Sequence, residues 1–229
     1  MVQIVNNIVF FDLEVNKKGY IVDIGATTDG TSVFRGKQAQ YFYNYIQGKK
    51  YIVAHNFFAH DSNYVSLSKH QIPIDTLVWS PLLFPKIPYH NLVKDDKLVG
   101  TDPNNPVNDS KKAMHLFYEL ASAFNALPTI KKEIYYLLLN KYEEYYGFFN
   151  FLDFKVRFKN VRTLIQQHFG DYFCGNAPLS YHIKHNPVEL AYALSILRFT
   201  QDSLTPKWVN ITYPKVRSIA SVTNLAPLH

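Results

Sequence analysis

The segment Ile8-Val9-Phe10-Phe11-Asp12-Leu13-Glu14 begins as a short apolar run of β-forming residues and ends in two carboxylates. It predicts a β-strand over residues 8–13. Side chains two positions apart on a strand project from the same face, so Asp12 and Glu14 should lie together. Adjacent carboxylates at the end of an apolar strand repel each other unless a cation neutralises them, and Mg²⁺ prefers oxygen ligands of this kind.

The residues up to position 126 alternate strand and helix signals, which predicts an α/β fold with a small mixed sheet. Asp29-Gly30 is a hairpin turn signal between expected strands over 20–26 and 32–35. Three prolines exclude a regular helix over 80–88. The other elements expected here are a helix over 36–48, a strand over 51–54, a helix over 60–69 and a strand over 74–79.

A long helix should begin at Pro106, because proline suits the first helical position and Asn105 suits the N-cap. Asp109 lies four residues before Ala113, which places it on the inward face of the helix near its N-terminus. The apolar stripe of this helix comprises Ala113, Leu116, Phe117, Leu120, Ala121 and Phe124.

The second half changes character, so we expect an α/β core over 1–126 and a helical, basic extension over 127–229. The core carries 12 Lys and Arg against 11 Asp and Glu, a net charge of +1. The extension carries 12 against 7, a net charge of +5. Its expected helices cover 130–139, 159–169, 187–199 and 214–222, with loops that contain Gly147, Gly170, Gly175 and Pro178.

Composition argues against several classes of protein. No stretch approaches the roughly 20 consecutive apolar residues of a membrane span. The N-terminus lacks the layout of a signal peptide. Cys174 is the lone cysteine, which rules out an internal disulfide framework and suits a reducing compartment. We therefore expect a cytoplasmic protein without a membrane partner.

The first half carries further carboxylates at the ends of its expected core elements. Asp61 follows the strand over 51–54 and the segment 55–60, and Asp109 lies at the start of the long helix. Each carboxylate alone could be an N-cap or a solvated loop residue. Chain direction can bring all of them to Asp12 and Glu14, so the set in this order predicts a metal site.

The segments that carry these carboxylates resemble the three motifs of the DEDD superfamily of 3′–5′ exonucleases. They are Phe11-Asp12-Leu13-Glu14, His55-Asn56-Phe57-Phe58-Ala59-His60-Asp61 and Asn105-Pro106-Val107-Asn108-Asp109. The match covers residues 7–126 and implies a ribonuclease H-like fold, a mixed sheet flanked by helices, that binds two Mg²⁺ or Mn²⁺ ions. The residues over 75–99 and 104–113 further resemble exonuclease domains at the N-terminus of bacterial RecQ-like helicase polypeptides.

The resemblance implies a role for each motif residue. Asp12 would bridge both ions, and Glu14 would bind the first. Asp109 would complete the shell of the first ion, and Asp61 would support the second through water. The pocket for the terminal nucleotide would be lined by Leu13, Asn56 and Phe57. For Phe57, a place in the hydrophobic core is the open alternative.

The sequence departs from the family where a general base is expected. The family carries a His five residues before the last aspartate or a Tyr four before it, and here these positions are Asn104 and Asn105. An amide cannot take a proton from water, and such assistance is typically worth about 10²–10⁴-fold in rate. Three alternatives remain open. The metal-bound water is acidic enough without a general base, a histidine elsewhere serves as the base, or the domain is weakly active or inactive and only binds nucleic-acid ends. The candidate histidines are His60, for which a structural role is the alternative, His90 and His115.

The second half contains a candidate strand-binding segment. Lys155, Arg157 and Lys159 alternate with apolar residues, so an extended chain would present them on one face toward phosphates. A solvated edge strand is the alternative. The aromatic residues nearby could stack on bases, but on helices most such residues are core: Tyr135, Tyr136, Tyr142, Tyr145, Tyr146, Phe148, Phe149 and Phe151.

We therefore expect a metal-dependent 3′–5′ exonuclease that acts on DNA 3′ ends, preferably single-stranded, in a process such as DNA repair. A helicase domain in the same polypeptide or in a partner is the expected associate. The alternatives are a weakly active or inactive module that binds nucleic-acid ends or a partner protein, and an RNA-directed exonuclease.

Overall fold

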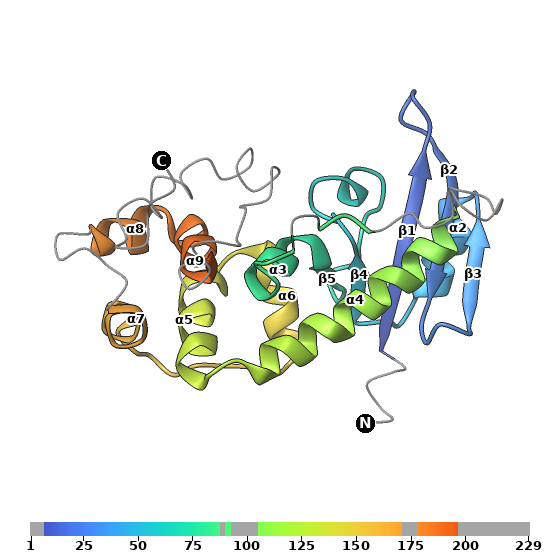
Figure 1. The fold of residues 1–229 in the computed structure, drawn as a ribbon. Coiled ribbons are helices and arrows are strands. Elements are labelled where there is room, and N and C mark those ends of the chain that lie inside the picture. Colours follow the sequence, from blue (N-terminus) through green and yellow to red (C-terminus); the bar gives the residue numbers. More distant parts are fainter. Residues whose placement is uncertain (1–6, 88–89, 93–104, 171–177, 197–229) are drawn as a thin grey trace. The chain divides into compact units, whose positions relative to one another are not determined.

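The computed structural model describes residues 7–87, 90–92, 105–170 and 178–196, and these form two compact units (Figure 1). The first unit contains the described residues of Met1–Leu77 and Asn91–Ala121. The second contains those of Val78–His90 and Ser122–His229. The predicted fold class is confirmed, because the first unit is built on a mixed sheet and the second is helical.

The sheet of the first unit has five strands in the order β3-β2-β1-β4-β5. β1 pairs antiparallel with β2, which pairs antiparallel with β3. β1 pairs parallel with β4, and β4 pairs parallel with β5. This order and these directions are compatible with a ribonuclease H-like fold. The strands are β1 (Ile8–Val15), β2 (Ile21–Thr27), β3 (Val33–Gly36), β4 (Tyr51–Ala54) and β5 (Ile72–Asp75).

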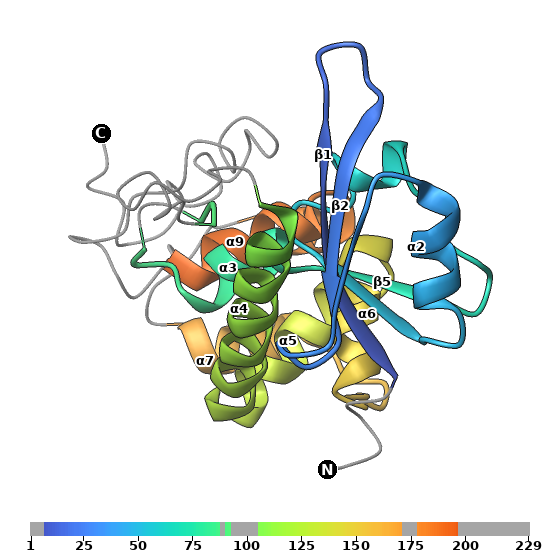
Figure 2. The same ribbon diagram turned by 90° about the vertical axis from the view of Figure 1, so that its right-hand side faces the viewer.

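Two helices of this unit cover opposite faces of the sheet: α2 (Ala39–Ile46) and the first part of α4 (Pro106–Ala126) (Figure 2). Neighbouring residues of β1 point to opposite faces. Phe11 accordingly packs against Phe42 of α2, with ring centroids 5.0 Å apart. Phe10 packs against Phe117 of α4, with ring centroids 5.5 Å apart. Asp12 and Glu14 follow Phe10 by two and four positions on β1. Their side chains therefore lie on the same face of the sheet as Phe10, which is the face covered by α4.

The helix predicted over 60–69 is wrong, since only a single 3₁₀ turn, η1 (Asp61–Asn63), forms there. Small polar side chains in this segment bond to nearby backbone carbonyls. Ser62 Oγ donates to the Phe58 carbonyl over 2.9 Å, and Asn63 Nδ2 donates to the His60 carbonyl over 3.0 Å. Such local bonds compete with a regular helix.

The strand predicted over 74–79 is wrong beyond Asp75, where β5 ends and α3 (Thr76–Leu83) begins. The Asp75 carboxylate accepts the Leu77 N–H over 2.8 Å, as an N-cap does. The exclusion of helix over 80–88 is also wrong for its first residues, because α3 contains Pro81. The ring of proline suits helical φ, and its missing N–H removes one helical hydrogen bond.

The second unit contains most of α3, the end of α4 and five further helices within the described ranges. They are α5 (Thr129–Leu139), α6 (Glu143–Phe151), α7 (Val161–Phe169), α8 (Leu179–His185) and α9 (Pro187–Ile196). Gly147 was expected in a loop, but it lies buried inside α6. The expected helix over 214–222 and Cys174 lie outside the described residues. Within the described ranges, no helix has the length and apolarity to cross a membrane.

Aromatic side chains form the core of the second unit. The Trp79 ring lies 4.3 Å from that of Phe148 by centroid, and it contacts Phe124 and Phe149 edge-on. The hydroxyl group of the buried Tyr192 has a hydrogen-bond partner, since it donates to the Val78 carbonyl over 2.8 Å. Of the aromatic residues with a predicted core role, Tyr135, Tyr145, Phe148 and Phe149 are buried, Tyr136, Tyr142 and Phe151 are half-buried, and Tyr146 is exposed.

Candidate metal centre

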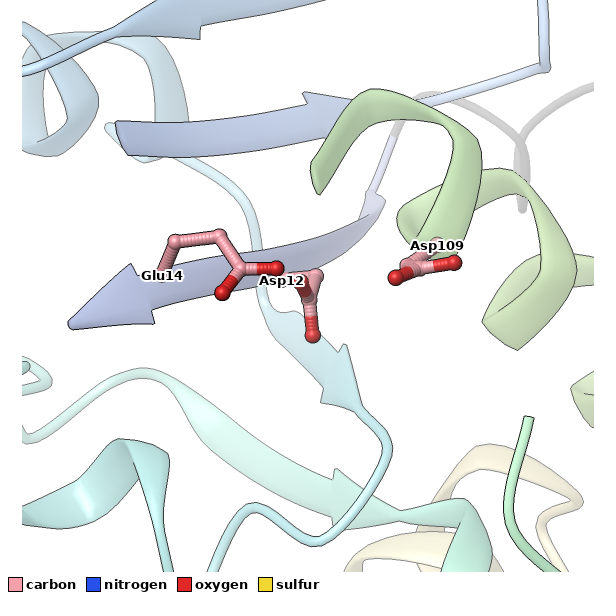
Figure 3. A group of neighbouring side chains, drawn as sticks. All are labelled: Asp12, Glu14 and Asp109. Carbon is pink, nitrogen blue, oxygen red and sulfur yellow. The ribbon is translucent and has the colours of Figure 1, made fainter. Parts of the chain in front are cut away.

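Strand β1 supplies two carboxylates to one face of the sheet. Asp12 pairs with Gly25 and Glu14 with Asp23 in the antiparallel register with β2. Figure 3 shows both side chains as neighbours of Asp109, which belongs to the first turn of α4. Both are half-buried, so they remain reachable from solvent while their neighbours Phe11 and Leu13 are in the core.

The first turn of α4 supplies the third carboxylate, Asp109, which is 6% exposed. The predicted N-cap is confirmed, because Asn105 Oδ1 accepts the Val107 N–H over 3.1 Å. The Asn105 carbonyl also accepts the Asp109 N–H over 3.2 Å, which sets the first turn. A carboxylate in this position is stabilised by the positive end of the helix dipole.

Gly25 allows α4 to approach the sheet at Asp12. A Cβ on Gly25 would overlap backbone atoms of Pro106 and Val107, so no other residue fits without a shift of the helix. Gly25 is the register partner of Asp12 on the neighbouring strand. The close approach of backbone to backbone therefore brings the first turn of α4, and Asp109 with it, to the carboxylates of β1.

One oxygen from each of Asp12, Glu14 and Asp109 lies within 4.8 Å of the other two. Lys112 Nζ lies 3.3 Å from Asp109 Oδ1. Closely spaced carboxylates stay ionised together only when positive charge offsets their repulsion. Three hard oxygen ligands converging from two elements are suited to a divalent cation such as Mg²⁺ or Mn²⁺.

Asp61 is placed differently from the other three carboxylates. It is not part of the three-carboxylate cluster, and it is 1% exposed. Among the described residues, its Oδ1 has no hydrogen-bond donor. The nearest charged partner is His60, whose Nδ1 lies 3.6 Å from this oxygen, beyond a normal hydrogen bond. Burial raises the pKa of Asp61, with the nearby imidazole opposing it.

His60 links Asp61 electrostatically to the cluster. The interaction with the Asp61 carboxylate raises the pKa of His60, partial burial opposes this, and Asp12 and Glu14 raise it further. The field of the two β1 carboxylates therefore reaches the segment that ends in Asp61. The Asp61 oxygen, which has no donor among the described residues, fits a cation, because a cation would supply the missing partner.

Sequence reasoning missed Asp75, a buried carboxylate at the end of β5. Its Oδ1 accepts the N–H groups of Asn56 over 2.9 Å and Leu77 over 2.8 Å, and its Oδ2 accepts that of Phe58 over 3.2 Å. Burial raises the pKa of Asp75 to about 6, although these three bonds lower it. The available signal was an aspartate directly before an apolar run, which is typical of a helix N-cap.

The expected pocket residues lie in or beside the core of the first unit. Leu13 and Phe57 are 3% and 4% exposed and belong to the cluster that contains Phe11. The Phe57 ring lies 6.3 Å from that of Phe11, which places it where the core interpretation expected it. Asn56 is half-buried and has a positive φ of 73°, an uncommon conformation for a residue other than glycine.

The structure describes three of the four remaining histidine and asparagine candidates, His90, His115 and Asn105. His115 is exposed on α4. His90 is buried in the second unit with its Nδ1 2.6 Å from Ser80 Oγ, and burial lowers its pKa to about 4. Asn104 lies outside the described residues. Asn105 serves as the N-cap of α4, and its side-chain oxygen is engaged there.

Lys155, Arg157 and Lys159 are all exposed in the segment that joins α6 to α7. The segment forms no strand, yet the half-buried Phe154 and Val156 alternate with these basic residues. Lys155 Nζ lies 2.8 Å from Asp153, and Lys159 Nζ lies 2.6 Å from Glu133. The predicted row of exposed basic side chains is therefore present, but carboxylates neutralise two of its members.

Comparisons of this chain with protein-family models, with curated proteins and with solved structures find no match.

Proposed function

We propose that this chain is a metal-dependent 3′–5′ exonuclease of the DEDD type, which hydrolyses phosphodiester bonds at DNA 3′ ends. The observation that carries the proposal is the convergence of Asp12, Glu14 and Asp109 from a strand and a helix that lie far apart in sequence. Asp61 adds a buried carboxylate oxygen without a hydrogen-bond donor among the described residues.

The four carboxylates serve two metal ions in this proposal. Asp12, Glu14 and Asp109 hold one Mg²⁺ or Mn²⁺ ion, and Asp61 supports a second. Ions bound in this way lower the pKa of water and offset the charge that develops on the phosphate and the leaving 3′ oxygen. The N-terminal turn of α4 holds Asp109 in place through the Asn105 cap.

His60 is the proposed base or support, because it is the imidazole beside Asp61. Its ring is partly exposed and also contacts Tyr64, with centroids 5.5 Å apart. The variant His60→Gln distinguishes the two roles. A loss of rate with unchanged metal binding supports proton transfer, whereas weaker metal binding supports a positioning role for the imidazole near Asp61.

The proposal is tested with purified protein on 3′- and 5′-labelled DNA and RNA, single- and double-stranded, in Mg²⁺, Mn²⁺ or EDTA. We expect mononucleotide release from 3′ ends that requires metal and fails in Asp12→Ala. The matched control is Glu119→Gln, an exposed carboxylate on α4. Absence of release in both metals, or equal activity of Asp12→Ala, contradicts the proposal. Relative rates on DNA and RNA determine the sugar preference.

A second candidate function is a non-catalytic module that binds 3′ ends. The observation that favours it is Asn105, which caps α4 at the position where the resemblance implies a tyrosine base. This candidate predicts end binding without cleavage by the wild type. Cleavage that appears only after Asn104→His would support it.

A further inference from the structure

Two buried aspartates lie on either side of one loop and have opposite hydrogen-bonding environments. Asp75 and Asp61 are each 1% exposed. Asp75 accepts three backbone N–H groups, so donors occupy both of its oxygens. Asp61 keeps one oxygen that has no donor among the described residues. Asp75 is therefore already satisfied by the protein, and Asp61 is the one available to a cation.

The three N–H donors to the Asp75 carboxylate show which segments of the chain it connects. Two of them, the N–H groups of Asn56 and Phe58, belong to the loop that follows β4 and leads into Asp61. The third, the Leu77 N–H, belongs to the first turn of α3. One carboxylate thus clamps the loop after β4 to the end of β5.

The loop needs such a clamp because its backbone is strained. Asn56 has a positive φ of 73°. Left-handed conformations in residues other than glycine persist where surrounding contacts impose them. The Ser62 N–H bonds to the Phe57 carbonyl over 2.9 Å, so the turn that carries Asp61 is built directly on this loop. The path from Asp75 to Asp61 is therefore short and continuous.

We infer that Asp75 is a positioning residue for the second metal site, which holds the loop over 56–61 so that Asp61 can bind a cation. The inference rests on the proposed function. Asp75 binds no metal itself in this scheme, since three N–H donors occupy its carboxylate. Its effect should therefore pass through Asp61 and leave the ion held by Asp12, Glu14 and Asp109 in place.

The experiment is a titration of Mn²⁺ into the full chain, followed by calorimetry and by electron paramagnetic resonance of free Mn²⁺. The wild type should bind two ions. Asp75→Asn keeps an oxygen acceptor but presents an NH₂ group to one of the N–H donors. We expect Asp75→Asn to lower the Mn²⁺ affinity of the second site at least tenfold and that of the first site less than threefold. Asp61→Asn should do the same, and the double variant should be no worse than Asp61→Asn alone.

Two further variants make the result specific. Asp75→Ser retains an N-cap for α3 but cannot hold the two loop N–H groups, so it should also lose the second ion while the protein folds. Asp29→Asn is the matched control, because Asp29 accepts the Thr31 and Ser32 N–H groups in the β2–β3 turn. It should bind both ions like the wild type.

The outcomes separate the inference from the proposed function. If the wild type binds no Mn²⁺, the metal site itself is contradicted. If the wild type binds two ions and Asp75→Asn binds both unchanged, only the inference is overturned. Equal weakening of both ions, or additive losses in the double variant, also overturns it, because Asp75 would then act on the general fold and not through Asp61.

Discussion

Asp109 is the most buried of the three clustered carboxylates, and its replacement tests the cluster directly. Asp109→Asn keeps the size of the side chain but removes its charge. Loss of an indirect partner of a metal ligand typically costs about 10–100-fold in affinity or activity, so loss of a direct ligand should cost at least about 100-fold. Calorimetric titration with Mn²⁺ and the nuclease rate measure the effect. Glu119→Gln is the control on the same helix, and a Mn²⁺ affinity of Asp109→Asn within threefold of wild type would remove Asp109 from the site.

The buried imidazole of His90 makes the free energy of unfolding depend on pH. Burial lowers the pKa of His90 to about 4, against about 6.5 in an unfolded chain. Between these values the unfolded chain binds a proton that the folded chain does not. The free energy of unfolding is therefore highest above about pH 6.5 and declines as the pH falls toward 4, by roughly 2–3 kcal/mol at pH 4.5.

Urea denaturation at pH 7 and pH 4.5 measures this contribution. Wild type should lose roughly 2–3 kcal/mol more of its unfolding free energy over this interval than His90→Gln does. Other titrating groups, including Asp75, are shared by both proteins and cancel in the comparison. An equal loss in the two proteins would contradict the lowered pKa of His90.

At the level of elements, the contact between β2 and α4 depends on Gly25. Gly25→Ala places a methyl group against the backbone of Pro106 and Val107, so the first turn of α4 must move. Overpacking of this kind typically costs about 1–3 kcal/mol. We expect this loss of stability together with weaker Mn²⁺ binding, because Asp109 moves away from Asp12.

Gly170→Ala is the matched control, since a Cβ at Gly170 meets nothing within 4 Å. Its unfolding free energy and Mn²⁺ affinity should stay close to those of the wild type. Tight Mn²⁺ binding by a destabilised Gly25→Ala would show that Asp109 is not held in place by this contact.

At the scale of the whole molecule, positive charge is concentrated in the second half of the chain, which has a net charge of +5. The triple substitution Lys155→Ala, Arg157→Ala and Lys159→Ala tests whether this charge contacts nucleic acid. Each phosphate contact on a single strand contributes about 0.7 to the slope of log K against log salt. Lys155 and Lys159 already pair with carboxylates, so Arg157 should provide the largest share.

Binding of a fluorescent single-stranded DNA at several salt concentrations measures this slope. The triple variant should show a slope shallower by about 0.7–2. The control removes Lys17, Lys18 and Lys37, three exposed lysines of the first unit. A slope that is unchanged in the first variant would show that its basic residues are only solvated.

Local features of the candidate site could be predicted from the sequence, because each depends on neighbours along the chain. The alternation of β1 places Asp12 and Glu14 on one face. The Asn105-Pro106 pair starts α4 and fixes Asp109 in its first turn. Segments whose polar side chains bond to the nearby backbone were less predictable, as in the 3₁₀ turn at Asp61.

The sequence by itself therefore determined which carboxylates stand at the ends of core elements and which face each one occupies. Only the tertiary structure decided which of them meet. Asp109 reaches Asp12 because Gly25 admits the backbone of α4, whereas Asp61 lies outside this group, in a turn that follows the loop bonded to Asp75. The physical reason is range: strand parity and helix caps are set by adjacent residues, whereas the approach of two elements depends on steric contacts between residues about 80 positions apart.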